Sequence, residues 1–354
     1  MEIKRRKSRK LALGKLFIGG DAPVSIQSML NVKTSELDKS AAQISNLAEA
    51  GCEILRFSVM DLEDAEAIKE LKNISPVPLI ADIHFDYKLA LAALEAGIDG
   101  LRINPGNIGE RSGVERLVAA ARERLVPIRI GVNSGSLPRD LLQAYGVSER
   151  SMVEAALRHI RLLEELDYHE IKVSVKASNL DLMLASYRLL ASSCPYPLHL
   201  GVTEAGTLLP GTVKSSLGLG FLLSEGIGDT IRVSLTADPA LEVKVAREIL
   251  KSLGLRKGLN IVSCPTCGRT RIDLIKLATE VERELQEFSE LPLTIAVMGC
   301  VVNGPGEARE ADFGIAGGRG EGLLFVKGEI VAKLPEAQLL PRLKALILSH
   351  SQER

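Results

Sequence analysis

Short apolar runs alternate with helical patterns along the first two thirds of the chain. Eight such runs begin near residues 24, 53, 78, 100, 127, 171, 198 and 230, and each has the length of a strand. The segments between them, such as AAQISNLAEA and MVEAALRHIRLLEEL, repeat apolar residues at i, i+3 and i+4, as amphipathic helices do. Eight strand–helix units in about 250 residues predict a (β/α)8 TIM barrel. An open doubly wound sheet is the alternative, but no glycine-rich dinucleotide fingerprint follows the first run.

The pattern changes after the eighth helix, at the polar segment LGLRKG. NIVSC and LTIAVMG read as strands, RIDLIKLATEVERELQEF as a helix, GLLFVKGEIVAKL as a hairpin and EAQLLPRLKALILSH as a closing helix. We therefore expect an α/β protein of two domains, a barrel in residues 1–257 and a smaller α+β domain in residues 258–354.

The composition gives the chain almost no net charge, so it indicates no particular class of binding partner. The chain has 354 residues, of which 46% are hydrophobic and 25% charged, with a formal net charge of −1. A net charge this close to zero does not attract nucleic acid or a membrane surface. No run of about 18 apolar residues is present to predict a membrane span. Lys15 interrupts the segment that follows the basic opening MEIKRRKSRK, so we expect a solvated arm rather than a signal peptide or a nucleic-acid tail.

The chain contains five cysteines. This number in a chain without a signal peptide indicates a reducing cytoplasm rather than a disulfide framework. Cys52 and Cys194 stand apart from the others in apolar or turn contexts, and we expect both to be structural.

Polar and apolar residues alternate in several of the predicted strands. Residues two apart share a face of a strand, and the intervening residues here are apolar, which places the polar set inside a barrel. The polar sets are Arg102 with Asn104, Lys172 with Ser174 and Lys176, and Arg232 with Ser234. Near the carboxyl ends of the strands, where such barrels hold their catalytic groups, they are joined by Arg56, Asp82, His84, Arg129, Asn133, His199, Thr203 and Glu204.

Four arginines and one lysine of this set come from five different strands. Burying several like charges in one barrel mouth is costly unless an anion compensates them, and the arginine fork fits phosphate oxygens. We infer a multiply charged anionic substrate, of which a diphosphate is the best fit. The alternative is an internal salt-bridge layer with Asp82 and Glu204.

The segment PGTVKSSLGLG lacks the spacing of a P-loop. Lys214 and Ser215 could lie near a helix start and reach an anion, or they could belong to an ordinary capped helix.

The segment SCPTCGRT places Cys264 and Cys267 two residues apart, a spacing used by zinc sites, redox disulfides and iron–sulfur clusters. A structural zinc site needs four ligands, and no second pair of this kind exists. A third thiol, Cys300, follows a predicted strand, and Glu307 follows the tight turn expected of NGPG. Three thiolates and a carboxylate oxygen suit a cluster with one weakly held iron. The cysteines alone leave cluster, zinc and redox pair open.

Taken together, the two halves resemble a known family, the bacterial hydroxymethylbutenyl diphosphate synthases of the non-mevalonate isoprenoid pathway (the GcpE/IspG family) in their shorter, two-domain form. The segments that carry the resemblance run in family order: GGDAPVSIQSM, ADIHFDY, LRINPGNIG, RIGVNSGSL, VSVKAS, PLHLGVTEAG, LLSEGIGDTIRVSL, CPTCGRT and GCVVNGPGEA.

The resemblance implies a cluster domain similar to those of sulfite and nitrite reductases, and a two-electron ring opening and dehydration of methylerythritol cyclodiphosphate. It implies a 4Fe-4S cluster, flavodoxin or ferredoxin as electron donor, and a homodimer whose active sites are shared between subunits. The implied metal ligands are Cys264, Cys267, Cys300 and Glu307. The implied substrate ligands are Arg56, Arg102, Asn104, Arg129, Lys176, Arg232 and Ser234, with Asn133 and Glu204 near the reacting carbons.

Two other classes of function stay open at this point. One is a non-redox barrel transferase, similar to dihydropteroate synthase, with a structural zinc in its second domain. The other is an electron-carrier module fused to an inert barrel, which would not need the arginines of the mouth.

Overall fold

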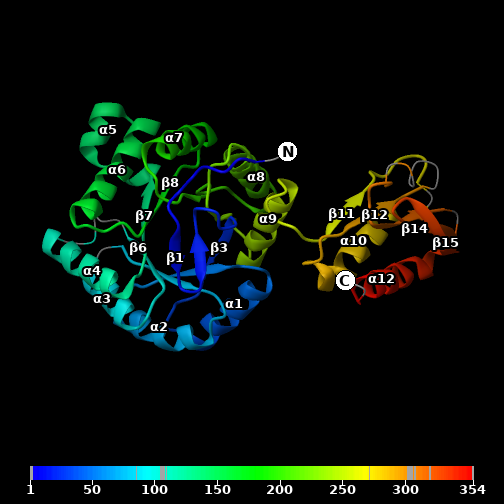
Figure 1. Cartoon of the computed structure of the whole chain (residues 1–354), viewed down its shortest axis with the longest axis horizontal. Helices are drawn as coiled ribbons and strands as arrows, with labels where there is room; N and C mark the ends of the chain where they lie inside the picture. Colours follow the sequence, from blue (N-terminus) through cyan, green and yellow to red (C-terminus); the bar gives the residue numbers. More distant parts are fainter. Residues whose placement is uncertain are drawn as a thin grey trace. The chain divides into compact units, whose positions relative to one another are not determined.

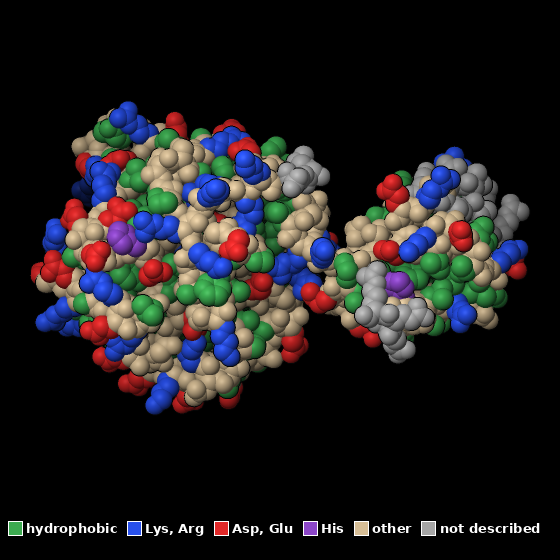
Figure 2. Space-filling view, in the orientation of Figure 1, with side chains coloured by type: hydrophobic (Ala, Val, Ile, Leu, Met, Phe, Trp, Pro, Cys, Tyr) green, Lys and Arg blue, Asp and Glu red, His purple; other side chains and the backbone are tan. Residues whose placement is uncertain are grey.

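A computed structural model describes residues 3–84, 86–103, 108, 110–270, 272–300, 306, 308–318 and 320–352 (Figure 1). The chain divides into two compact units, Met1–Leu255 and Arg256–Arg354. No helix in the described part of the chain is long and apolar enough to cross a membrane. Basic and acidic side chains are intermixed over the visible face of the first unit, as the near-zero net charge predicts (Figure 2).

Eight parallel strands form the barrel of the first unit, in the order β8-β7-β6-β5-β4-β3-β10-β9. The ring closes between β8 and the segment before β9, where Val173 pairs with Leu198. The strands are β3 (Ser25–Met29), β4 (Ile54–Ser58), β5 (Leu79–Asp82), β6 (Gly100–Ile103), β7 (Ile128–Asn133), β8 (Ile171–Lys176), β9 (His199–Leu200) and β10 (Thr230–Ile231). The predicted TIM-type barrel is confirmed, with a strand at each of the eight apolar runs.

Helices form an outer ring around these strands (Figure 1). They are α1 (Leu37–Glu49), α2 (Leu62–Ile74), α3 (Tyr87–Glu95), α4 (Arg111–Arg124), α5 (Arg139–Tyr145), α6 (Glu149–Glu165), α7 (Leu180–Ser193), α8 (Leu208–Ser224) and α9 (Pro239–Ser252). Local sequence sets their starts. Ser148 and Ser151 form a capping box at α6, and Asp238 caps α9, which begins with proline.

A hairpin that the sequence patterns did not predict lies at the amino-terminal end of the barrel. It consists of β1 (Leu11–Leu13) and β2 (Leu16–Ile18). Leu13 packs with Ile54 and Ile80, which lie at or near the starts of β4 and β5. A Cβ at Gly100 would stand 2.8 Å from Leu13, so glycine is needed where the hairpin meets β6. The hairpin therefore plugs the end of the barrel opposite to the carboxyl ends of the strands.

The basic opening of the chain is bound to the barrel, so the prediction of a solvated arm is wrong. Arg5 and Ser8 each donate a 2.9 Å hydrogen bond to the buried carboxylate of Asp229. The backbone N–H of Arg6 donates to the carbonyl of Gly226. Positive charge at this end of the chain neutralises a buried aspartate, a use that composition alone did not reveal.

The second unit is a five-stranded sheet in the order β11-β12-β13-β14-β15, with the first three strands parallel and the last two added antiparallel. Its elements are β11 (Asn260–Ser263), α10 (Leu274–Glu284), β12 (Thr294–Met298), β13 (Phe313–Gly317), β14 (Glu321–Val326), β15 (Glu329–Pro335) and α12 (Glu336–Gln352). Helices α10 and α12 supply Leu277, Val281 and Leu343 to one apolar core with the sheet. The sequence patterns missed β13, whose run FGIAG is interrupted by glycine.

Candidate functional site

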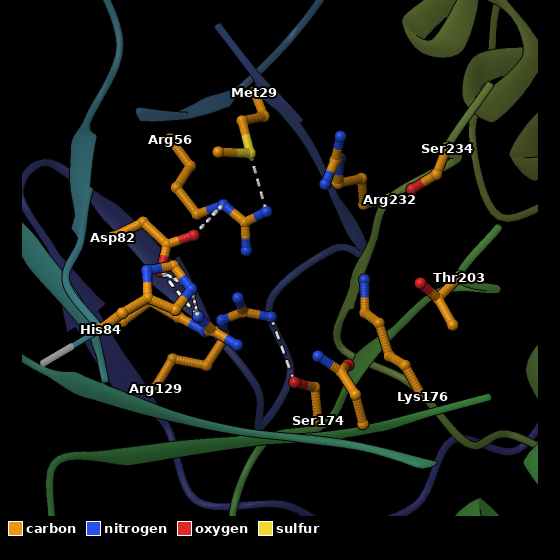
Figure 3. A pocket seen from close by; sticks show the side chains of 12 residues that line it. Met29, Arg56, Asp82, His84, Arg129, Ser174, Lys176, Thr203, Arg232 and Ser234 are labelled. Atoms are coloured by element: carbon orange, nitrogen blue, oxygen red, sulfur yellow. Dashed lines mark hydrogen bonds and ion pairs between the residues drawn. The ribbon is translucent and has the colours of Figure 1, made fainter. Parts of the chain in front are cut away.

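A polar pocket of about 270 Å³ opens at the carboxyl ends of the barrel strands. Figure 3 shows guanidinium groups and the Lys176 ammonium turned toward one central space. The described lining residues are Met29, Arg56, Asp82, His84, Arg102, Arg129, Asn133, Ser174, Lys176, Thr203, Arg232 and Ser234. The alternation along the strands therefore brings together Arg56, Arg102, Arg129, Asn133, Lys176, Arg232 and Ser234, seven of the residues singled out from the sequence.

Strand register places cations beside one another in and below this pocket. Arg102 on β6 is paired with Arg129 on β7, and Arg129 in turn is paired with Lys172 on β8. Each inward side chain thus lies next to an inward side chain of the neighbouring strand. The barrel itself, rather than flexible loops, holds the cations in place, which favours a preorganised binding site.

Asp82 is the one carboxylate among the described lining residues of the pocket. Its two oxygens lie 2.9 Å from Nη1 of Arg102 and 3.4 Å from Nε of Arg56. Burial by itself raises the pKa of Asp82, but the charges of Arg56, Arg102 and Arg129 outweigh burial and lower it. Asp82 is therefore ionised and offsets part of the positive charge.

The remaining charge is not offset by the described lining residues, which contain five cations and one carboxylate. Burial, followed by the charge of Arg129, holds the pKa of Lys176 well below its usual range. Burial likewise lowers the pKa of Arg56 to about 10. An anion with several charges would relieve this repulsion, and it would find the guanidinium forks already in place.

Two residues that support the pocket were missed by sequence reasoning. Glu242, in the first turn of α9, is buried, lies 3.7 Å from Arg232 and accepts a hydrogen bond from the backbone of Leu235. Met29 lines the pocket beside Arg56, whose Nη2 lies 2.9 Å from its sulfur. Glu242 could have been noticed as an acidic residue at the start of α9. Nothing in the sequence pattern marked Met29.

A second polar layer lies inside the barrel but outside the pocket. Lys172 and His199 are buried, and neither is a lining residue. The Lys172 ammonium and both ring nitrogens of His199 have no hydrogen-bond partner among the described residues. Burial and then the Lys176 charge lower the pKa of His199. The expectation that His199 belongs to the mouth is therefore wrong, because it stands at the start of its strand.

Four other candidates are not among the described lining residues. Glu204 is exposed on the loop after β9, next to the lining residue Thr203 but not itself in the lining, with a left-handed backbone φ of 53°. Lys214 and Ser215 lie within α8 and not at its start, so their proposed anion contact at a helix start is not formed. The expected ligand Asn104 lies outside the described residues.

In the second unit, two of the three candidate thiols lie on adjoining loops. Cys264 follows β11, and Cys300 follows β12, which pairs in parallel with β11 through Ser263 and Val297. The backbone N–H of Gly299 donates a 3.2 Å hydrogen bond to the sulfur of Cys264. The carboxyl ends of the two strands thereby bring the Cys264 sulfur against the residue that precedes Cys300.

Cys267 lies in a tight turn, where Thr270 accepts from its backbone N–H and donates to its carbonyl. A hydrogen bond from the Arg269 backbone is the main cause that lowers the pKa of the exposed Cys267 thiol. All five cysteines are free, with Cys52 and Cys194 buried as expected.

The donor set fits an iron–sulfur cluster in its chemistry, since it offers thiols, a pKa shift that favours the thiolate and an N–H directed at sulfur. Within the described residues, however, no three histidine, cysteine or acidic side chains form a group that could hold a metal ion. Glu307, the expected fourth ligand, lies outside them.

Comparison with known proteins gives consistent matches over nearly the whole chain. Residues 8–247 match the family model described as the GcpE TIM-barrel domain, and residues 260–349 match the GcpE protein C-terminal domain. A relative from Geobacter sulfurreducens, "4-hydroxy-3-methylbut-2-en-1-yl diphosphate synthase (flavodoxin)", is 62% identical over 96% of this chain and 97% of its own. A relative of the same name from Clostridium perfringens is 55% identical over 98% of this chain and 99% of its own.

Among solved structures, dihydropteroate synthase from Yersinia pestis superposes with a TM-score of 0.50, covering 69% of this chain and 97% of that one, at 16% identity. At this level of identity the likeness shows a common barrel fold and nothing of the activity.

Proposed function

Since the chain belongs to the GcpE family, we propose that it catalyses the reductive ring opening of 2-C-methyl-D-erythritol 2,4-cyclodiphosphate. The product is 4-hydroxy-3-methylbut-2-enyl diphosphate, the compound in the name of its curated relatives. In this reaction two electrons enter, the bond between a ring carbon and a phosphate oxygen breaks, and a hydroxyl group leaves as water. The observation that carries the proposal is the pocket, in which five cations surround one described carboxylate.

The pocket residues bind and orient the diphosphate. Arg56 on β4, Arg129 on β7 and Arg232 directly after β10 approach it from different sides of the barrel, so that charges from separate strands and strand ends hold its two phosphates. Lys176 and Ser234 contribute an ammonium and a hydroxyl, and Asn104 contributes an amide. Asp82 holds Arg102 in place, as its 2.9 Å contact indicates.

Two residues are proposed to act at the reacting carbons. Asn133 ends β7 at the pocket wall, where its amide can orient a substrate hydroxyl. Glu204, on the loop that also presents Thr203 to the pocket, is proposed to give a proton to the leaving hydroxyl or to position that group. Its exposure lets it exchange protons with solvent between turnovers.

Cys264, Cys267, Cys300 and Glu307 are proposed to hold a 4Fe-4S cluster, which would supply the electrons one at a time. The hydrogen bond from Gly299 to Cys264 and the lowered pKa of Cys267 support thiolate ligation. The name of the relatives supports flavodoxin as the electron donor, with ferredoxin as the alternative. We further propose a cytoplasmic location, which the free state of the five thiols supports.

A homodimer with active sites shared between subunits completes the proposal. Barrel helices run back toward the amino-terminal ends of the strands, so α9 ends away from the pocket. The connection from α9 to β11, residues 253–259, spans at most roughly 25 Å. So short a connection favours a second unit that serves the pocket of another chain.

The direct test is anaerobic turnover of the cyclodiphosphate with reduced flavodoxin, with purified protein assayed for iron, sulfide and zinc. We expect the hydroxymethylbutenyl product and about four irons per chain, with most of the iron lost in Cys300→Ser. If product forms without flavodoxin, the proposed electron donor is wrong but the proposed reaction stands. Stoichiometric zinc without iron, and no product, would overturn both and favour a transferase.

A further inference from the structure

Two glycines occupy inward positions in the wall of the pocket. On β7, Gly131 stands between Arg129 and Asn133, which both line the pocket, so it shares their face of the strand. Gly201 directly follows β9 and comes two residues before the lining residue Thr203. Glycine weakens a strand, and neither glycine has the positive φ that would require one. The missing side chains therefore have a reason in space rather than in backbone conformation.

That reason is contact with the cations of the pocket. A Cβ at Gly131 would stand 3.0 Å from Nε and 3.2 Å from Nη2 of Arg102. A Cβ at Gly201 would stand 2.6 Å from Nζ of Lys176 and 2.8 Å from the carbonyl oxygen of Arg232. Among the glycines in the described part of the chain, only these two have a pocket-lining residue among the nearest neighbours of such a Cβ. The two cationic side chains thus lie directly against bare backbone.

Arg102 is also held at its other terminal nitrogen. Its Nη1 donates a 2.9 Å hydrogen bond to Asp82 and lies 2.6 Å from Nε2 of His84. Its Nε, the atom nearest to a Cβ at Gly131, is buried and has no hydrogen-bond partner among the described residues. A methyl group at residue 131 would push the guanidinium by a few tenths of an ångström and disturb its contact with Asp82. Gly131 therefore sets the position of the guanidinium.

Lys176 is positioned by packing alone. Asp82 pairs with the arginines beside it, and no ion pair among the described residues involves Lys176. The backbone at Gly201 is so close that a Cβ there would overlap the ammonium. The same Cβ would press on the backbone of Arg232, another lining residue. One missing side chain thus gives room to two cationic residues.

We propose that Gly131 and Gly201 are positioning residues, which hold the Arg102 guanidinium and the Lys176 ammonium where both reach one bound diphosphate. The inference rests on the proposed function for the identity of the substrate, although any diphosphate anion would meet the same two cations. A side chain at either glycine leaves the number of charges in the pocket unchanged and displaces them. Displacing a charged group from its binding geometry weakens the complex even though no charge is lost.

The first test is a double-mutant cycle on the full chain, purified anaerobically. Calorimetry measures the binding of inorganic pyrophosphate and of the cyclodiphosphate to the wild type, Gly131→Ala, Arg102→Ala and the double variant. We expect Gly131→Ala to weaken the binding of both ligands about 10-fold, because it displaces Arg102. In the Arg102→Ala background the same change should have little effect, since no guanidinium is left to displace. Binding to Arg102→Ala stays measurable because the other four lining cations remain.

Two comparisons separate positioning from a general effect on the fold. Gly220→Ala is the matched control and should bind as the wild type does, since its Cβ meets nothing within 4 Å among the described residues. Gly201→Ala is compared with and without Lys176→Ala, and part of its loss should persist because the Cβ also presses on Arg232. Urea unfolding checks that each variant is folded, and the Gly131 cycle decides alone if Gly201→Ala is not.

Wild-type binding in Gly131→Ala, or an equal loss with and without Arg102, would overturn the inference. If the wild type forms product from the cyclodiphosphate while those losses are equal, the positioning role is wrong and the proposed function stands. If the loss of pyrophosphate binding depends on Arg102 but no product forms, the positioning role stands and the proposed function fails.

Discussion

Lys172 shows how much charge the barrel interior holds. Burial, and then repulsion by Arg129, lowers the pKa of Lys172 to about 7, far below the ordinary value for lysine. Folding therefore favours loss of its proton between pH 7 and about 10, where the unfolded chain still binds it. In this window the free energy of unfolding rises with pH, because the unfolded state binds more protons.

Lys172→Met should remove this dependence. We expect the variant to be about 1–4 kcal/mol more stable than the wild type near neutral pH, with the difference shrinking as pH rises. Urea unfolding at several pH values between about 6 and 10 measures it. Lys69→Met, at an exposed lysine of α2, is the control and should leave the pH profile unchanged. Parallel profiles for wild type and Lys172→Met would contradict the lowered pKa.

Binding and chemistry should separate between Arg232, which lines the pocket, and Glu204 on the loop after β9. Arg232→Ala removes a pocket charge that we propose binds phosphate, and it should weaken substrate binding by about 2–5 kcal/mol. Glu204→Gln keeps size and polarity but removes the proton, so turnover should fall by roughly 10²–10⁴ with little change in binding. Calorimetric titration and single-turnover kinetics measure the two effects, and iron content checks that the proposed cluster is retained. Wild-type turnover in Glu204→Gln would refute its role.

Helices and strands could be predicted from the sequence more completely than the contacts between them. The two-residue period of polar side chains in LRIN, IKVSVK and TIRVS placed Arg102, Lys176 and Arg232 in one mouth because strand geometry fixes which residues share a face. Depth along the strand is not encoded in that period. The period therefore gave no sign that His199 lies at the start of β9, below the mouth. It lies next to Leu198, which pairs with Val173 where the barrel closes.

What sequence reasoning missed depends on tertiary packing. Glu242 reaches Arg232 from a helix, and the contact exists only once α9 has packed beside β3. The β1–β2 hairpin has strands of three residues each, too short to show any period. Its position depends on complementary shape, with Leu13 lying where Gly100 has no side chain.

The close fit of Leu13 against Gly100 predicts that substitutions at these two residues partly compensate each other. Leu13→Ala should cost about 2–5 kcal/mol by leaving a cavity, and Gly100→Ala about 1–3 kcal/mol by crowding Leu13. In the double variant, the methyl group introduced by Gly100→Ala partly fills the space that the Leu13 side chain leaves, so the two costs should not add. Urea unfolding of the four proteins measures the coupling. Strict additivity would mean that the hairpin can shift away from β6 freely.

At the scale of the whole molecule, the proposed sharing of active sites between subunits can be tested by mixing two variants. Arg232→Ala damages the barrel pocket and Cys264→Ser damages the second unit, so each variant should be inactive alone. Mixed under conditions that let subunits exchange, they should regain activity if each site combines two chains, because one site of the mixed dimer then lacks both defects. If each site belongs to one chain, activity stays absent at every mixing ratio. Two preparations of Arg232→Ala mixed together are the control.

The way the barrel closes also matters while the chain is being made. The Ser25 hydroxyl on β3 donates a hydrogen bond to Thr230 on β10, which lies 205 positions further along the chain. The ion pair of Arg5 likewise cannot form until Asp229 has been made. At about 5–20 residues per second, roughly 10–40 seconds pass on the ribosome before the first strand meets its last neighbour. During that interval the edge of β3 is an unpaired template for other strands. We therefore expect the start of this chain to need shielding from other strands until β10 has been made, and a ribosome stalled before that point to leave the edge of β3 uncovered.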